Sequence, residues 1–102
     1  MEQYIAVRVY ELDSEEKITI HVFKPFLDEE DYRCDFEIIG FLNNIKSYAM
    51  GSDSIQALFL ALSRIAIILY TSEEYKHGRL TLYGSLNLDL PYPDTIADLV
   101  KK

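Results

Sequence analysis

The six residues Gly51-Ser52-Asp53-Ser54-Ile55-Gln56 mark the point at which the apolar periodicity of the chain changes from two residues to 3.6. Asp53 is a good N-cap residue and Gln56 falls at the N3 position, so the pair predicts a reciprocal capping box at the start of a helix. The sequence alternates like β-strands before this stretch and has helical spacing after it. The stretch therefore divides the chain into a predicted sheet followed by a predicted helix.

The predicted helix runs from this cap to about Ser72. Its buried stripe, which should pack on the sheet, consists of Ile55, Leu58, Phe59, Leu62, Ile65, Ala66 and Leu69. Leu60 and Ile67 fall on the opposite arc of the helix, where no core is predicted. We expect either the C-terminal segment or a second subunit to cover these two residues.

Four strands are expected in the first half of the chain, at about residues 4–10, 17–23, 31–40 and 45–50. Lys24-Pro25 should end the second strand, and an asparagine of Leu42-Asn43-Asn44 should supply a positive φ between the third and fourth. The first strand has Ile5, Val7 and Val9 on one face and Tyr4, Ala6, Arg8 and Tyr10 on the other, which we assign to the outside. The third has Tyr32, Cys34, Phe36 and Ile38 toward the core, with Asp31, Arg33, Asp35 and Glu37 outward.

The C-terminal third has weaker signals. Residues 73–78 are expected to form a loop and 79–83 a further strand, followed by an extended stretch in which Leu86, Leu88 and Leu90 alternate. Asp94 or Thr95 should cap a short terminal helix. The predicted fold is α+β: a four-stranded antiparallel meander (ββββ), one long helix on one face, a C-terminal extended segment and a short helix, all in a single domain spanning residues 1–102.

Composition excludes several classes of function. The 102 residues include 17 acidic and 10 basic side chains, and a net charge of −7 argues against a nucleic-acid partner. The N-terminus shows no export signal, and the most apolar stretch, residues 55–70, is shorter than the roughly 20 residues that cross a bilayer. We therefore expect a cytoplasmic protein with no membrane contact.

The residues that could carry catalytic chemistry are few. The single cysteine, Cys34, lies on the predicted core face, which favours a buried and inert thiol. His21 and His77 are the only histidines, and neither has another ligand at metal-binding spacing. We expect no metal, no cofactor and no enzymatic activity. If the protein were an enzyme, its best residues would be His21, Asp35 and Glu37.

The acidic residues are unevenly distributed. Residues 1–37 contain eleven acidic and four basic side chains, so the whole net charge of −7 lies there. In a meander, the cluster at residues 11–16 and the cluster at residues 28–31 fall at opposite ends of the sheet. The second cluster continues along an outward strand face, so the candidate surface for a basic protein partner is Asp28, Glu29, Glu30, Asp31, Asp35 and Glu37.

Aromatic side chains suggest another surface. Tyr4, Tyr10, His21, Phe23 and Tyr48 are assigned to the outward sheet face, and tyrosine is enriched at protein interfaces. Either the C-terminal segment covers this face or a partner does. Tyr4, Tyr10, Phe23 and Tyr48, together with Leu60 and Ile67 on the helix, are the candidates for a homodimer interface. A structural homo-oligomer is therefore the alternative to a module that binds a different protein.

Several segments resemble one family over most of the chain. They are residues 32–40 (Tyr-Arg-Cys-Asp-Phe-Glu-Ile-Ile-Gly), residues 51–62 from Gly51 to Leu62, residues 80–84 (Leu-Thr-Leu-Tyr-Gly) and Leu90-Pro91. This combination of an aromatic-x-Cys strand and a Gly-x-Asp-Ser-x-Gln-Ala-Leu helix start is similar to the DUF6968-like proteins, a family of small bacterial domains. The resemblance implies a shared fold and a bacterial cytoplasmic setting, and it implies no activity. Some small acidic bacterial domains are immunity proteins that neutralise toxins, so an immunity-like role is an expectation by analogy.

Overall fold

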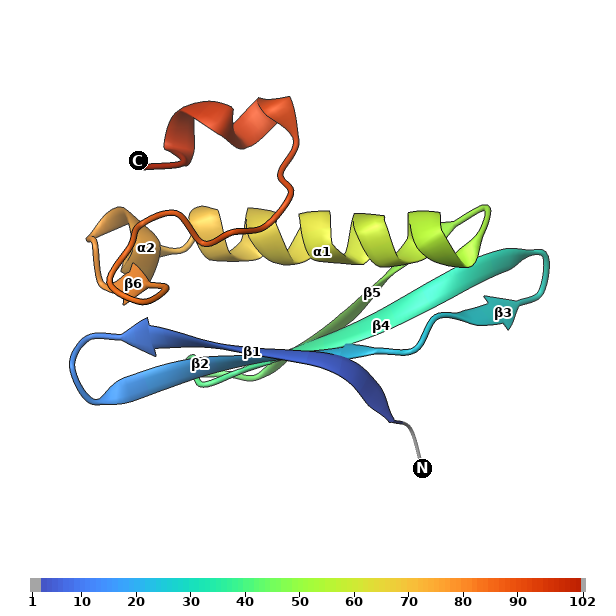
Figure 1. Ribbon diagram of the computed structural model, residues 1–102, viewed down its shortest axis with the longest axis horizontal. Helices are drawn as coiled ribbons and strands as arrows, with labels where there is room; N and C mark the ends of the chain where they lie inside the picture. Colours follow the sequence, from blue (N-terminus) through green and yellow to red (C-terminus); the bar gives the residue numbers. More distant parts are fainter. Residues whose placement is uncertain (1–2, 102) are drawn as a thin grey trace.

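The computed structural model describes residues 3–101, which form an antiparallel sheet with one long helix on one face (Figure 1). This confirms the predicted α+β class. The strands are β1 (Tyr4–Leu12), β2 (Glu16–Phe23), β3 (Phe26–Asp28), β4 (Asp31–Ile39), β5 (Ile45–Gly51) and β6 (Leu80–Thr81). The helices are α1 (Ser54–Tyr70), the short α2 (Glu73–Lys76) and the 3-10 helix η1 (Asp94–Leu99). The α2 turn replaces the loop predicted after the long helix.

The sheet is the predicted four-strand meander with two short strands added. β2 and β3 both pair with β4, β5 also pairs with β4, and β6 pairs with β1. Lys24 and Pro25 separate β2 from β3, because proline has no amide hydrogen to donate to a ladder. β6 is shorter than the strand predicted at residues 79–83, because a tight turn brings Leu82 back to Ser85.

The connection from β4 to β5 depends on Gly40. Gly40 has a φ of 124°, and a Cβ at this position would overlap the carbonyl oxygen of Lys17 on the neighbouring strand β2. Asn44 accepts a hydrogen bond from the Gly40 amide through Oδ1, at 3.4 Å. The prediction that an asparagine takes the positive φ here was therefore wrong, because the chain turns earlier, at the glycine.

The start of α1 follows the predicted cap with one change. The Asp53 carboxylate accepts a hydrogen bond from the Gln56 amide at 2.7 Å, as expected of an N-cap. The Gln56 side chain accepts from the amide of Ser52 at 2.6 Å, one residue before the position that a reciprocal capping box requires. A Cβ on Gly51 would lie 2.5 Å from the Ala57 amide nitrogen, so the first turn of α1 sits directly against the end of β5.

The buried face of α1 differs from the predicted stripe. Ile65, Ala66 and Leu69 are buried as expected, but Ile55 and Phe59 are 79% and 55% exposed. Ala57 and Ala61 face the core instead, and their small side chains let the helix backbone approach the strands closely. The predicted buried face was rotated by part of a turn because the prediction chose the most hydrophobic positions. Close packing on a sheet favours the smaller alanines instead.

The two faces of β1 are the reverse of the prediction. Tyr10 and Leu12 are buried under the C-terminal segment, whereas Ile5, Val7 and Val9 are exposed. Tyr10 is therefore not available as an interface residue. A register shift between Tyr4 and Ala6 leaves Tyr4 outward while Tyr10 points inward, so simple alternation fails along this strand.

The C-terminal strap, defined as residues 86–91, covers the inner face of β1. An extended segment without ladder partners must satisfy its backbone groups elsewhere, and buried tyrosines do this. Tyr10 donates to the Leu88 carbonyl at 2.8 Å, and the Leu88 amide donates to the Tyr70 hydroxyl at 2.9 Å. Tyr75 donates to the Leu86 carbonyl at 2.7 Å. The strap is thus fixed to both layers of the fold.

η1 follows the strap and packs on α1 through the buried Ile96 (Figure 1). Pro93 precedes the first helical residue, and no side chain caps the helix, so the predicted cap at Asp94 or Thr95 was wrong. The C-terminal segment therefore covers α1 and the inner face of β1, and it leaves the other face of the sheet open.

Candidate functional site

The sheet face opposite α1 has no covering layer within residues 3–101 (Figure 1). Pairing places Val7 opposite His21, Asp35 opposite Tyr48, and Arg33 opposite Met50 on this side. Its large exposed apolar side chains are Tyr4, Val7, Val9, Phe26, Tyr48 and Met50. We call these six residues the outer sheet face. The outward positions of β2 and β4 between them carry polar residues such as His21 and Glu37. Large apolar side chains left bare on one sheet face make this surface a candidate for binding.

A hollow of about 320 Å³ lies on the same side, between β2, β4 and β5. Its polar lining forms pairs: Arg33 donates to Asp35 at 2.6 Å, and Lys46 lies 3.9 Å from the Glu37 carboxylate. The Arg33 guanidinium also lies 3.9 Å from the centre of the Tyr48 ring, where a cation–π contact is favourable. Asp35 and Glu37 are therefore partly buried, and each lies beside a cation.

The other four predicted acidic residues form the β3–β4 hairpin. Asp28 pairs with Asp31, and Glu29 has a positive φ of 62° in the turn between them. The hairpin borders Met50, so its charges lie at the rim of the outer sheet face. The other acidic cluster, at residues 11–16, lies at the opposite end of the sheet, as predicted (Figure 1).

The predicted interface residues divide into separate surfaces. Tyr4 lies on the outer sheet face and stacks on His21 with a centroid distance of 4.2 Å, and Phe23 makes an edge contact with Tyr4. Leu60 and Ile67 are 39% and 38% exposed on α1, so the C-terminal segment does not fully cover them, and they belong to the other layer. One partner surface cannot include both groups.

The three residues favoured for catalysis are not joined in one cavity. His21 is the Cα partner of Glu37 across β2 and β4, but the hollow that includes Asp35 and Glu37 is not lined by His21. Among the described residues, no cluster of three or more His, Cys, Asp or Glu side chains could hold a metal ion. His77 stands apart at the end of α2.

Cys34 is fully buried on the inner face of β4, as its alternation predicts. Its thiol donates a hydrogen bond to the Phe23 carbonyl at 3.4 Å. Burial raises the pKa of the Cys34 thiol to about 11. The thiolate that nucleophilic or redox chemistry requires is therefore scarce at neutral pH.

We expect Cys34 to react with a disulfide reagent such as DTNB at pH 8 at least about 100-fold more slowly in the native protein than in urea. A pKa near 11 leaves only about one thiol in a thousand ionised at that pH, against about a quarter for an ordinary cysteine. The absorbance of the released thiol measures the rate. A native rate equal to the denatured rate would show that the thiol is accessible and ionised.

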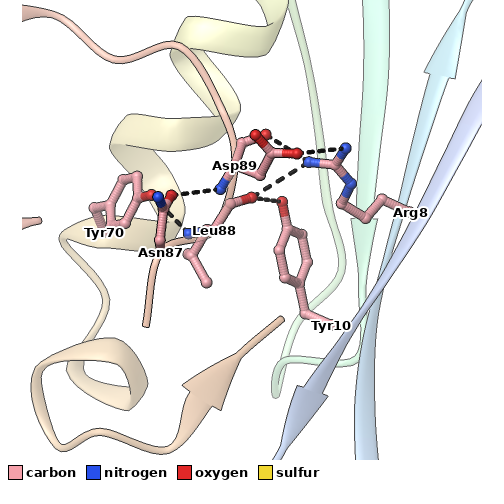
Figure 2. A network of polar contacts seen from close by, with 6 residues as sticks. All are labelled: Arg8, Tyr10, Tyr70, Asn87, Leu88 and Asp89. Atoms are coloured by element: carbon pink, nitrogen blue, oxygen red, sulfur yellow. Dashed lines mark hydrogen bonds and ion pairs between the residues drawn. The ribbon is translucent and has the colours of Figure 1, made fainter. Parts of the chain in front are cut away.

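Sequence reasoning missed a polar network around the strap (Figure 2). Arg8 donates through Nη1 to the carbonyl oxygens of Leu88 at 3.3 Å and Asp89 at 2.6 Å. The Asp89 amide donates to the Asn87 side chain at 2.9 Å, and Asp89 has a positive φ of 55°. The available signal was Arg8 itself, a charged residue on the same face of β1 as the buried Tyr10. The prediction had assigned this face to the outside, where an arginine is ordinary.

The fold and this surface define a class: an α+β domain of one main helix on an antiparallel sheet, with the opposite sheet face bare among the described residues. Residues 6–92 match the model of a family described as a domain of unknown function, DUF6968, and the chain belongs to that family. The resemblance inferred from the sequence is therefore confirmed. No curated protein and no solved structure matches the chain. No helix within residues 3–101 has the length and apolar character needed to cross a bilayer.

Proposed function

We propose that this protein is a non-enzymatic binding module, and that a protein partner docks on the outer sheet face. The observation that carries the proposal is that six large apolar side chains are exposed on a sheet face without a covering layer among the described residues. Val7, for example, is 50% exposed in the middle of β1. Protein interfaces commonly combine such apolar side chains with charged and polar ones.

The charge at the rim favours a basic partner. Glu29, Glu30 and Asp31 are exposed on the β3–β4 hairpin, beside Met50 of the outer sheet face. Acidic residues at a rim accelerate association with a positively charged protein. A partner that carries an apolar patch surrounded by Lys and Arg fits both features. Neutralising such a protein in the bacterial cytoplasm, as an immunity protein does, is the specific role we propose.

A homodimer is the alternative to binding a different protein. Leu60 and Ile67 are both exposed on α1 and offer a surface away from the acidic rim. Two copies that met through their outer sheet faces would bring two molecules of net charge −7 together, which opposes association at low salt. The charge therefore favours a different, basic protein over a homodimer.

The test is calorimetric titration with the proteins encoded by neighbouring genes. We expect Val7→Glu to weaken binding by at least about 50-fold, because it places a charge among the apolar side chains of the outer sheet face. In a stopped-flow measurement of the association rate, Glu30→Lys should slow association and reduce its salt dependence. The matched control Leu60→Glu places the same charge on the other layer and should leave binding unchanged.

Two results would contradict docking of a different protein on the outer sheet face, and a third would contradict the immunity-like role. One is binding that Leu60→Glu abolishes and Val7→Glu leaves intact. The other is a dimer in light scattering at micromolar concentration that either variant dissociates, because this would make the protein its own partner. If none of the neighbouring proteins bound the monomer, the immunity-like role would also be wrong.

A further inference from the structure

A second cavity, of about 240 Å³, lies on the inner side of the sheet between β1, β2, α1 and the strap. Its apolar walls are Ala6, Ile20, Val22, Leu62, Leu90 and Pro91. The cavity is separated from the outer sheet face by the sheet itself. It is therefore independent of the partner surface proposed above.

Arg8 stands at this cavity where the alternation of β1 calls for a core residue. The next inward positions of the strand, Tyr10 and Leu12, are buried and apolar in character. A residue that breaks the pattern of its own strand beside a cavity is a typical sign of a functional position. Arg8 thus provides one cation at the mouth of an apolar space.

The guanidinium retains binding capacity. Its two hydrogen bonds with described residues both use Nη1, while a guanidinium has five N–H donors. Nη2 lies 3.6 Å from the Asp89 carboxylate, well beyond the roughly 2.8 Å of a strong charge-assisted bond. The Asp89 side chain is 78% exposed, so it can move into solvent when another carboxylate approaches.

The strap bends at the cavity mouth at Asp89. This residue adopts a left-handed φ of 55°, a conformation that Asp tolerates better than most residues, and the Asn87 side chain and Arg8 hold it there (Figure 2). The cavity, the cation and the bend of the strap coincide at one place.

We propose that this cavity binds a small apolar monocarboxylic acid whose carboxylate pairs with Arg8 and whose hydrocarbon part lies against Leu62 and Leu90. A cavity of about 150 Å³ holds benzene, so about 240 Å³ corresponds to a ligand of about ten non-hydrogen atoms. The bidentate match between guanidinium and carboxylate gives the site its selectivity.

Octanoate, which has ten non-hydrogen atoms, is the probe. Titration of the ¹⁵N-labelled protein should give saturable shifts at the amides of residues 6–10 and 88–90, with a Kd below about 1 mM. Octanamide has the same size without the charge and should bind at least tenfold more weakly, and acetate should give no saturable shift. Equal binding of octanoate and octanamide would overturn the proposal, because the site would then recognise hydrocarbon alone. The absence of any saturable shift with octanoate would overturn it as well.

Two variants locate the site. Ala6→Leu fills the cavity from an exposed position on β1, so it should block octanoate while the rest of the spectrum stays native. Arg8→Gln should weaken octanoate at least tenfold and leave octanamide unchanged, a difference that a merely structural role of Arg8 would not produce. The controls Ala97→Leu and Arg64→Gln make the same changes on the helices, away from the cavity, and should have no effect. Octanoate binding that survives Ala6→Leu would place the ligand elsewhere.

Discussion

Substituting Gly40 with alanine is expected to lower the free energy of unfolding by about 3–4 kcal/mol. Two costs combine at this position. The φ of 124° is unfavourable for any residue with a Cβ, and that Cβ would overlap the carbonyl oxygen of Lys17. The clash is with the backbone of β2, so no side-chain rotation relieves it. Urea unfolding followed by circular dichroism measures the loss, and the melting temperature should fall by roughly 15 °C.

Alanine substitutions at two other glycines measure the two costs one at a time. Gly78 has a φ of 74°, and a Cβ added there would meet no atom within 4 Å, so Gly78→Ala should cost only about 1 kcal/mol of backbone strain. Gly51 has no positive φ but faces the Ala57 amide, so Gly51→Ala should cost about 1–3 kcal/mol from overlap. If Gly40→Ala were no more destabilising than Gly78→Ala, the loop would not lie against β2 as described.

The second large effect is expected at the strap. Leu88→Ala should lower the free energy of unfolding by about 3 kcal/mol, because the Leu88 side chain is fully buried between the layers. Its backbone bonds to Tyr10 and Tyr70 remain available in the variant, so the loss measures packing alone. The same urea experiment provides the number.

Leu42 supplies the matched control for this substitution. Its side chain is 99% exposed in the β4–β5 connection, so Leu42→Ala should change the free energy of unfolding by less than about 0.5 kcal/mol. Equal effects of the two substitutions would mean that the strap contributes no core packing in solution.

Strands and helix start could be predicted because their signals are local. The alternation in β4 correctly placed Cys34 inward and Asp35 outward, and Asp53 is the N-cap that its position suggested. The same reasoning failed for β1 because this strand carries apolar residues on both faces. The register shift beside Ile5 then removed the strict period of two on which the assignment depended.

The candidate sites were predictable to different degrees. The acidic rim could be located because its residues are adjacent in sequence and form one hairpin. The network at Arg8 joins positions about 80 residues apart, and no local pattern reports such a contact. The role of Tyr10 was missed for the same reason: its partner Leu88 reaches β1 only after the helix has reversed the direction of the chain.

The unpaired edge of β1 has a consequence for the tendency of the protein to aggregate. β6 pairs with only Glu11 and Leu12 among the described residues of this strand, so the segment from Tyr4 to Tyr10 lies at a sheet edge. Edges of this kind recruit strands from other molecules and start fibril growth, and proteins oppose this with bulges and with charges that point inward. On β1 the register shift beside Ile5 is such a bulge, and Arg8 is such an inward-pointing charge. Both oppose aggregation through the exposed valines of this strand.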